Sequence, residues 1–305
     1  MPDPVLYWQA MAAAACAGAA AVLAIGWVRR PASAARRNLA CVAGLALGLA
    51  LGYEALRLWP AWPPANGLGR FLWIVFPAIV WIEGIAAVER APRWCGWCLR
   101  LALAACIGRI LLHDSAYLVG PKREWTAAQA AVALSVSGAV LMIAWALLLR
   151  LAQRSPGVSI PLAIAQASLC GGAVIMLAGY LTGGAAAAPL AAALAGVALA
   201  SRAIAARPEM RGAIGIGVVG LFSLLFIGRY FGGLSTLSAL ALFLAPLLCW
   251  ATEIPALRDR PPWLIAALRL TLVAIPLIAA LAAAKRDFDR SGLARFELPP
   301  GIEDR

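Results

Sequence analysis

Ten apolar stretches, each long enough to cross a membrane, constrain this chain more than any other feature of its sequence. They cover about residues 7–28, 39–58, 71–88, 98–119, 127–151, 160–181, 188–205, 213–227, 234–252 and 263–284. A spanning α-helix needs about 20 mostly apolar residues, and backbone groups in lipid must bond within their own helix or barrel. The sequence therefore predicts an all-α, polytopic transmembrane helical bundle with about ten spanning helices, nine or eleven being the alternatives.

The composition excludes a soluble domain of this size. Apolar residues make up 63% of the 305 residues, charged residues make up 13%, and the mean hydropathy is +0.85. Soluble domains are about 45–50% apolar and about 25% charged. We therefore expect a single transmembrane domain over residues 1–284, with membrane lipids around it. Residues 285–305 are expected to form a short, polar and loosely ordered tail.

The net charge of +12 predicts the orientation of the chain, and we expect no nucleic-acid partner. Segments after the odd-numbered spans hold 14 Lys and Arg residues, whereas segments after the even-numbered spans hold 5. The 14 are Arg29, Arg30, Arg36, Arg37, Arg90, Arg93, Arg100, Arg150, Arg154, Arg202, Arg207, Arg211, Arg258 and Arg260. Basic residues collect on the cytoplasmic side. Both termini are therefore predicted outside the cytoplasm. The preference for Ala, Gly and Arg over Ile and Lys is typical of a GC-rich bacterial genome, and we expect the bacterial inner membrane as the location.

A shift of 169 residues reveals an internal repeat. Residues 71–105 and 240–274 are identical at 11 of 35 positions, where chance in such a chain gives roughly a tenth. The matches include scarce residues, namely Pro77 with Pro246, Pro92 with Pro261, Trp81 with Trp250, Trp94 with Trp263, and Arg100 with Arg269. We predict two parallel copies, over about 7–126 and 186–284. Such copies fit the two halves of a carrier, and equally a duplicated packing unit without activity.

Two carboxylate–arginine pairs are expected inside the membrane. Glu83 in the third span lies at about the depth of Arg100 in the fourth. Glu253 and Arg269 repeat this arrangement, although Glu253 is one residue out of register with Glu83. Charged groups in a span are costly unless they are paired. We interpret both pairs as structural ion pairs between consecutive helices.

A second polar group is predicted nearer the outer face. Arg109 is expected near the bilayer midplane, with His113 on the same helix face and Asp114 beside it. Glu54 is expected at the same depth, and Arg229 lies near the outer end of its own span. These residues are the candidate substrate-binding residues of an outward-facing pocket. The alternative is an Arg109–Glu54 pair that only locks two helices together.

The cysteines offer one further hypothesis. Cys95 and Cys98 are spaced as in a thiol redox motif, but the strand–helix context of that motif is not predicted here. Zinc needs four ligands, and no His, Asp or Glu array with metal-ligand spacing is present in the sequence. We therefore expect no metal and no cofactor.

Three hypotheses for function remain open. The first is a transporter-type protein that moves a small solute between two repeats, because duplicated halves, helix-bending prolines and charge inside the membrane suit alternating access. The second is a non-catalytic membrane subunit or scaffold with membrane-protein partners. The third is a membrane-embedded enzyme, for example one that performs thiol redox chemistry.

Overall fold

The computed structural model describes residues 4–28, 33–88, 92–119, 124–205, 208–254, 257 and 260–296. Helices of this part of the chain provide ten segments that are long and apolar enough to span a membrane, so the all-α bundle is confirmed. The elements are α1 (Pro4–Val28), α2 (Ala34–Ala55), α3 (Gly67–Arg70), η1 (Phe71–Val75), α4 (Phe76–Ala87), α5 (Arg93–Leu111), α6 (Ala127–Arg154), α7 (Ser159–Leu177), α8 (Leu181–Ala185), α9 (Ala187–Ile204), α10 (Arg211–Phe231), α11 (Thr236–Leu244), η2 (Ala245–Glu253) and α12 (Pro262–Phe296).

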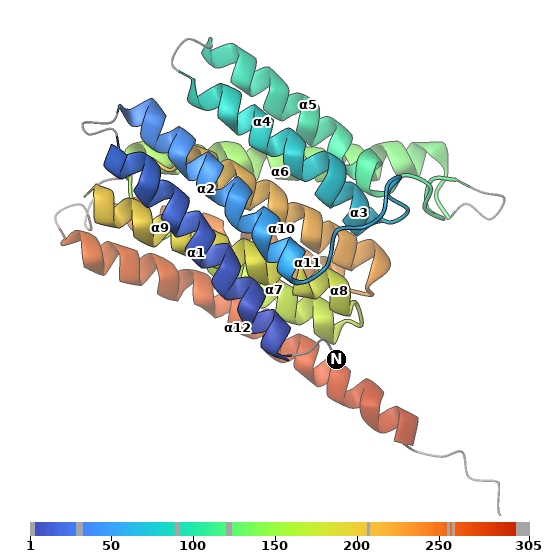
Figure 1. Ribbon diagram of the computed structural model, residues 1–305. Coiled ribbons are helices and arrows are strands. Elements are labelled where there is room, and N and C mark those ends of the chain that lie inside the picture. Colours follow the sequence, from blue (N-terminus) through green and yellow to red (C-terminus); the bar gives the residue numbers. More distant parts are fainter. Residues whose placement is uncertain are drawn as a thin grey trace, which may run out of the picture.

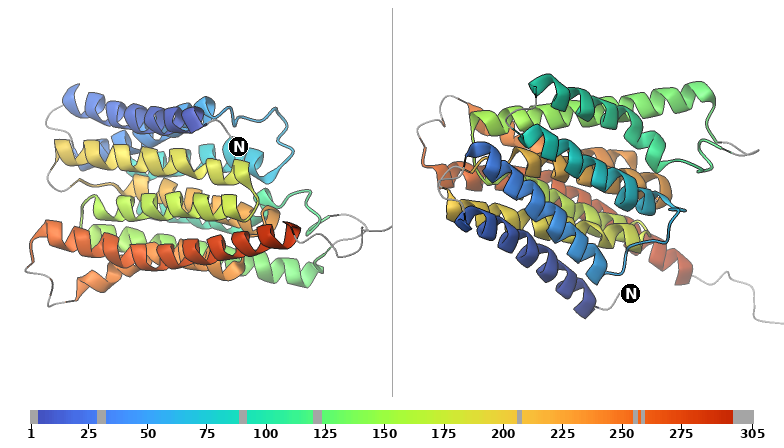
Figure 2. Two further views of the ribbon diagram at one scale, coloured as in Figure 1. Left: turned by 90° about the horizontal axis from the view of Figure 1, so that it is seen from below. Right: turned by 45° about the horizontal axis from the view of Figure 1, so that its top comes forward.

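The helices lie side by side in one bundle, with α10 at its centre (Figure 1). Almost every residue of α10 from Gly212 to Gly228 is buried, and this helix contacts α2, α4, α6, α7, α9 and α11. On one flank α1 packs against α2 and α9, and on another α12 packs against α7 and η2 (Figure 2). The core is therefore built on α10 and α9, while α1 and α12 expose much of their surface to the surroundings.

One end of the bundle carries several described arginines and is called the arginine-rich end below. It is the end at which α1 ends and α2 begins, and the chain starts at the opposite end (Figure 1). Described arginines at this end are Arg36, Arg37, Arg154, Arg202 and Arg211, which lie in the first or last turns of their helices. Of the other charges used to predict the orientation, Arg29, Arg30, Arg90, Lys122, Arg123, Arg207 and Arg258 lie outside the described residues.

Small residues hold α1, α2 and α9 in unusually close contact. A Cβ atom added to Gly44 would lie 2.8 Å from the Gly18 carbonyl oxygen, and one added to Gly48 would lie 2.5 Å from that of Ala14. In α9, a Cβ atom on Gly196 would lie 2.4 Å from the Ala15 carbonyl oxygen. Distances below 3.0 Å are not tolerated by real Cβ atoms. Glycine at these positions is therefore a requirement of the packing.

Two spans change helix type at a proline. In the third span, π-helical η1 gives way to α4, and Pro77 is the second residue of α4. In the ninth span, α11 gives way to the 3₁₀-helix η2, and Pro246 is the second residue of η2. Proline has no N–H to donate to the preceding turn, which explains why the regular α pattern is interrupted at both places. These are the two prolines that the 169-residue shift superimposes.

The structure corrects several predicted boundaries. The fourth span is α5, which begins at Arg93 and ends at Leu111, earlier than the predicted range of 98–119. The seventh span begins at Leu181, because α7 ends before Gly179, whose φ of +96° suits a helix terminus. The last helix continues to Phe296, so the expected loose tail is wrong for residues 285–296, and residues 297–305 lie outside the described part.

The close contact between α1 and α2 predicts different effects for two glycine substitutions. Gly48→Ala should lower the thermal unfolding midpoint in detergent, because the new methyl group meets the Ala14 carbonyl oxygen. Gly84→Ala in α4 is the matched control, because nothing lies within 4 Å of its added Cβ atom. Alanine also favours a helix over glycine by about 1 kcal/mol. Gly84→Ala should therefore leave the midpoint unchanged or raise it; equal midpoints for both variants would contradict the described packing.

Candidate functional site

Glu83 and Arg100 form a buried ion pair between α4 and α5. Arg100 donates from Nε and Nη2 to the two carboxylate oxygens of Glu83, each at 2.8 Å, and Glu83 is 0% exposed. The guanidinium group also lies 5.3 Å from the Trp97 ring centroid and 5.6 Å from that of Trp145. A planar, two-pronged contact of this kind fixes both side chains and satisfies both charges. The pair joins α4 and α5 and touches α6 through Trp145.

Helix α10 is shaped to receive the Glu83 side chain. A Cβ atom on Gly215 would lie 2.3 Å from the Glu83 carboxylate, so only glycine leaves room for the carboxylate here. One turn earlier, the Gly212 N–H donates to the buried Asn38 side chain on α2 at 2.8 Å. The carboxylate therefore lies where α2, α4, α5 and α10 meet. This position explains why one ion pair contributes to the packing of several helices.

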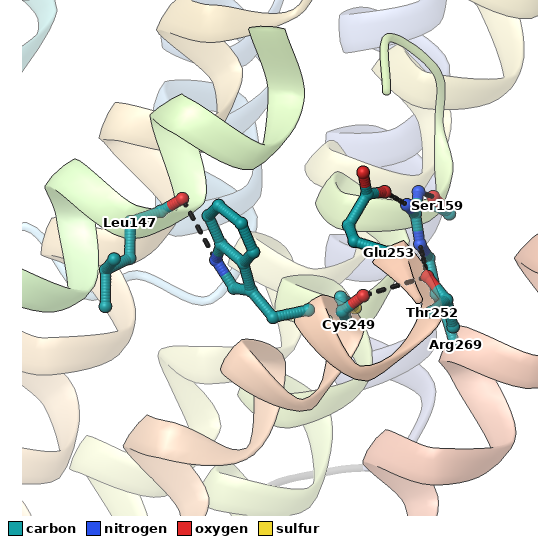
Figure 3. Close-up of polar contacts among 7 residues, drawn as sticks. Leu147, Ser159, Cys249, Thr252, Glu253 and Arg269 are labelled. Carbon is teal, nitrogen blue, oxygen red and sulfur yellow. Dashed lines mark hydrogen bonds and ion pairs between the residues drawn. The ribbon is translucent and has the colours of Figure 1, made fainter. Parts of the chain in front are cut away.

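A second buried arginine, Arg269 on α12, is held by three side chains (Figure 3). Its Nε donates to Thr252 Oγ1 at 2.7 Å, its Nη1 to Ser159 Oγ at 2.9 Å, and its Nη2 to Glu253 at 2.7 Å. Arg269 is 2% exposed, whereas Glu253 lies at the partly exposed edge of the cluster. Nearby, the Trp250 indole donates to the Leu147 carbonyl oxygen of α6. The cluster thus links α12, η2 and α7.

The two arginine clusters share one register. Arg100 uses Nε to bond residue 83, and Arg269 uses Nε to bond residue 252, so the sequence separation is 17 in both cases. Each acceptor and each arginine also correspond under the 169-residue shift. Thr252 therefore occupies the place of Glu83, and Glu253 binds the same guanidinium group from the next position. The duplication of whole four-helix units stays a prediction.

The structure does not bring Arg109 and Glu54 together. Both side chains are exposed, and neither takes part in an ion pair within the described residues. Because α5 ends at Leu111, Arg109 lies in the last turn of this helix and not in its middle. A cation at a helix C-terminus is favourable and needs no carboxylate partner. The predicted Arg109–Glu54 lock is therefore not formed.

The other predicted substrate-binding residues make local contacts instead. His113 and Asp114 lie 2.8 Å apart, and Asp114 is 3.8 Å from Arg70. Arg70 is largely buried and also donates to the carbonyl oxygens of His113 and Ala65, so it fastens the segment after α5 onto α3. Sequence reasoning assigned no role to Arg70. The sequence feature that could have drawn attention to Arg70 is its position at the end of a short helical turn that Asn66 caps.

Arg229 lies apart from these residues. Its Nε donates to Thr236 Oγ1 at 2.7 Å, and its guanidinium carbon lies 5.5 Å from the Tyr230 ring centroid. These contacts join the end of α10 to the start of α11. An outward-facing pocket made of Glu54, Arg109, His113 and Arg229 is consequently not supported by the contacts of these side chains.

A large cavity lies elsewhere, between α1, α2 and α9 at the arginine-rich end. Its volume is about 620 Å³. Apolar side chains such as Val22, Ile25 and Leu39 form most of its described lining, which also includes the charged residues Arg36, Arg37 and Glu209. Cys41 and Ser201, whose side chains are 3.3 Å apart, are also part of its wall. Its size is that of a small-molecule site. The sequence pattern did not reveal it, because its shape depends on how three helices cross.

A second depression and the proposed redox pair are less enclosed. An open depression of about 470 Å³ lies on α6 beside Trp125 and Gln129. Cys95 and Cys98 are free thiols in the first two turns of α5, one half-buried and the other exposed. The residues around them form helices, whereas a thioredoxin-type motif follows a strand. Groups of three or more potential metal ligands are absent from the part of the chain that the structure describes.

The buried pair predicts strong coupling between Glu83 and Arg100. Glu83→Gln and Arg100→Leu should each lower stability by about 3–5 kcal/mol, because each leaves a buried charge without its partner. The double variant should be more stable than the sum of the two losses predicts. Thermal unfolding in detergent measures all three variants. Glu54→Gln and Arg109→Leu provide the control cycle, whose effects should simply add; additive losses at Glu83 and Arg100 would contradict the pair.

In comparisons with known proteins, no protein-family model, curated protein or solved structure matches the chain.

Proposed function

We propose that this chain is a transporter-type protein of the bacterial inner membrane that binds a small solute in the cavity between α1, α2 and α9. The cavity is the observation that supports this proposal. About 620 Å³ of space lies between three spanning helices, and its wall combines apolar surface with a few polar groups. This combination is typical of sites for small organic molecules.

Two features of the bundle suit a protein that changes shape. The third and ninth spans both change helix type at a proline, and such interruptions are places where a spanning helix bends. The Arg100 cluster joins the third span to the helix that follows it, and the Arg269 cluster joins the ninth span to the next helix and, through Ser159, to α7. The third and fourth spans are therefore expected to move as one unit, and the ninth and tenth spans to move together with α7.

The proposed orientation places the arginine-rich end in the cytoplasm and both termini outside. Its support is the excess of Arg at the end where α1 meets α2, together with the positive-inside rule. The cavity would then open toward the cytoplasmic leaflet. Solute would enter from that side, or leave to it, depending on the direction of transport.

A non-catalytic membrane subunit is the second candidate function, and one observation favours it. Trp81 on α4 is 72% exposed within a spanning segment. Its counterpart under the 169-residue shift, Trp250, is half-buried and donates a hydrogen bond to α6. An additional helix from another protein would cover Trp81 in the same way. Thiol redox catalysis by Cys95 and Cys98 is not supported by a comparable observation.

The proposed orientation predicts the side from which two new cysteines react. In a background without native cysteines, Ala34→Cys at the start of α2 should react with an impermeant thiol reagent only when the membrane is opened. Ala127→Cys at the start of α6 lies at the opposite end and should react in intact cells. Labelling of both positions is compared before and after permeabilisation. The reverse pattern would overturn the orientation.

Alternating access predicts that a cavity residue is reachable from both sides of the membrane. Cys41 lines the cavity, so a variant that retains Cys41 as its sole cysteine should react with an impermeant reagent from either side of proteoliposomes. A variant that retains only Cys16 is the control, because Cys16 is exposed on the middle of α1 and lipid shields it. Cys16 should react from neither side. Reaction of Cys41 from one side alone would favour the subunit over the transporter.

A further inference from the structure

The cavity lies beside a close contact between α1 and α2. The two helices meet at Gly18 and Gly44, where a Cβ atom on Gly44 would lie 2.8 Å from the Gly18 carbonyl oxygen. Val22 still lies against Gly44, whereas Gly26, one turn nearer the arginine-rich end, faces Ile204 of α9. The last turns of α1, the first turns of α2 and the end of α9 line the cavity there.

The chemical character of the cavity wall changes from apolar to charged toward the membrane surface. Apolar residues of α1 and α2, among them Ile25, Leu39 and Ala43, form the part within the membrane. Leu39 and Ala43 are exposed on α2, so the cavity surface is open to the surrounding lipid on that side. A ligand that fills this part must itself be apolar and must be able to enter from the bilayer.

The described part of the rim carries more basic than acidic side chains. Arg36 and Arg37 lie in the first turn of α2, which contains no acidic residue, and Glu209 is the acid among the described lining residues. The formal charge of these three residues together is +1. Arginine binds carboxylate, sulfonate and phosphate groups through several N–H donors.

From this combination we infer that the cavity binds a single-chain anionic amphiphile, with its chain against α1 and α2 and its acid group at Arg36 and Arg37. The inference rests on the proposed solute site and names its substrate class. A single chain fits better than a two-chain phospholipid, because one cavity of about 620 Å³ has the size of a small-molecule site. The nearest anionic lipid would supply the same charge, so the experiment includes it as a competitor.

The test uses the full-length protein in phosphatidylcholine nanodiscs. The probe is dodecanesulfonate with a terminal diazirine, which stays anionic at every pH, and the reference is dodecanol with the same diazirine. After irradiation, labelled peptides are identified by mass spectrometry, and the half-saturating concentration is measured for each probe. Labels are expected on peptides of α1, α2 and α9, and the sulfonate should saturate at a lower concentration than the alcohol.

Four variants separate charge from shape. Arg36→Gln with Arg37→Gln should raise the half-saturating concentration of the sulfonate about 25-fold, or about fivefold for each arginine, and leave the alcohol unchanged. Arg36→Lys with Arg37→Lys should retain most of the affinity. Arg202→Gln removes an exposed arginine from the same end of the bundle, outside the cavity lining, and should have no effect. Ala43→Leu narrows the cavity and should weaken both probes.

Three results would overturn the inference: equal saturation of the sulfonate and the alcohol, labelling outside α1, α2 and α9, or displacement of the sulfonate by phosphatidylglycerol as effectively as by unlabelled dodecanesulfonate. The last result would identify a leaflet phospholipid as the occupant. These outcomes are separable from failure of the transport proposal. Selective sulfonate binding, together with reaction of Cys41 from one side alone, would support the ligand class and refute transport. Unselective binding, together with reaction of Cys41 from both sides, would refute the ligand class and support transport.

Discussion

Close contact between small residues is the constraint on which the rest of this bundle depends. Lipid tails are as apolar as a leucine side chain, so burying apolar surface gives spanning helices little reason to associate. Dispersion between closely packed backbones must supply the attraction, and Gly44, Gly48 and Gly196 allow that approach around α1. The cavity lies next to the same contact, at the arginine-rich end of α1 and α2.

The two buried arginines show how one geometry accepts different partners. Arg100 meets a fully buried carboxylate, and the two opposite charges compensate each other. Arg269 instead meets two hydroxyl groups and a carboxylate at the edge of the protein. Both solutions satisfy the directional donors of the guanidinium group, which is what a charged side chain in the membrane requires. A hydroxyl group at residue 252 suffices because Glu253 and Ser159 supply the remaining acceptors.

The fold was predictable from the sequence, whereas the candidate site was not. Ten spans follow from apolar length alone, since lipid leaves the backbone one way to satisfy its hydrogen bonds. The end of the fourth span was mispredicted because apolar residues continue beyond Leu111, where the helix itself ends. Glu253 is one residue out of register with Glu83 because Thr252 takes the matching place. In 3₁₀ geometry every third residue faces the same way, and Pro246, Cys249 and Thr252 form one buried row. The cavity depends on crossing geometry, which no single-sequence pattern records.

The 3₁₀-helix also decides whether the ninth span is long enough. Thr236–Glu253 has 18 residues, which as a regular α-helix would measure about 27 Å. A 3₁₀-helix rises about 2.0 Å per residue, so nine α-helical and nine 3₁₀ residues together reach about 31 Å. The hydrocarbon core of a bilayer is about 30 Å thick. The 3₁₀ half of the segment thus brings the length of the span to the thickness of the hydrocarbon core. If η2 returned to α geometry, the span would shorten by about 4 Å, and the end that carries Thr252 and Glu253 would be drawn into the lipid.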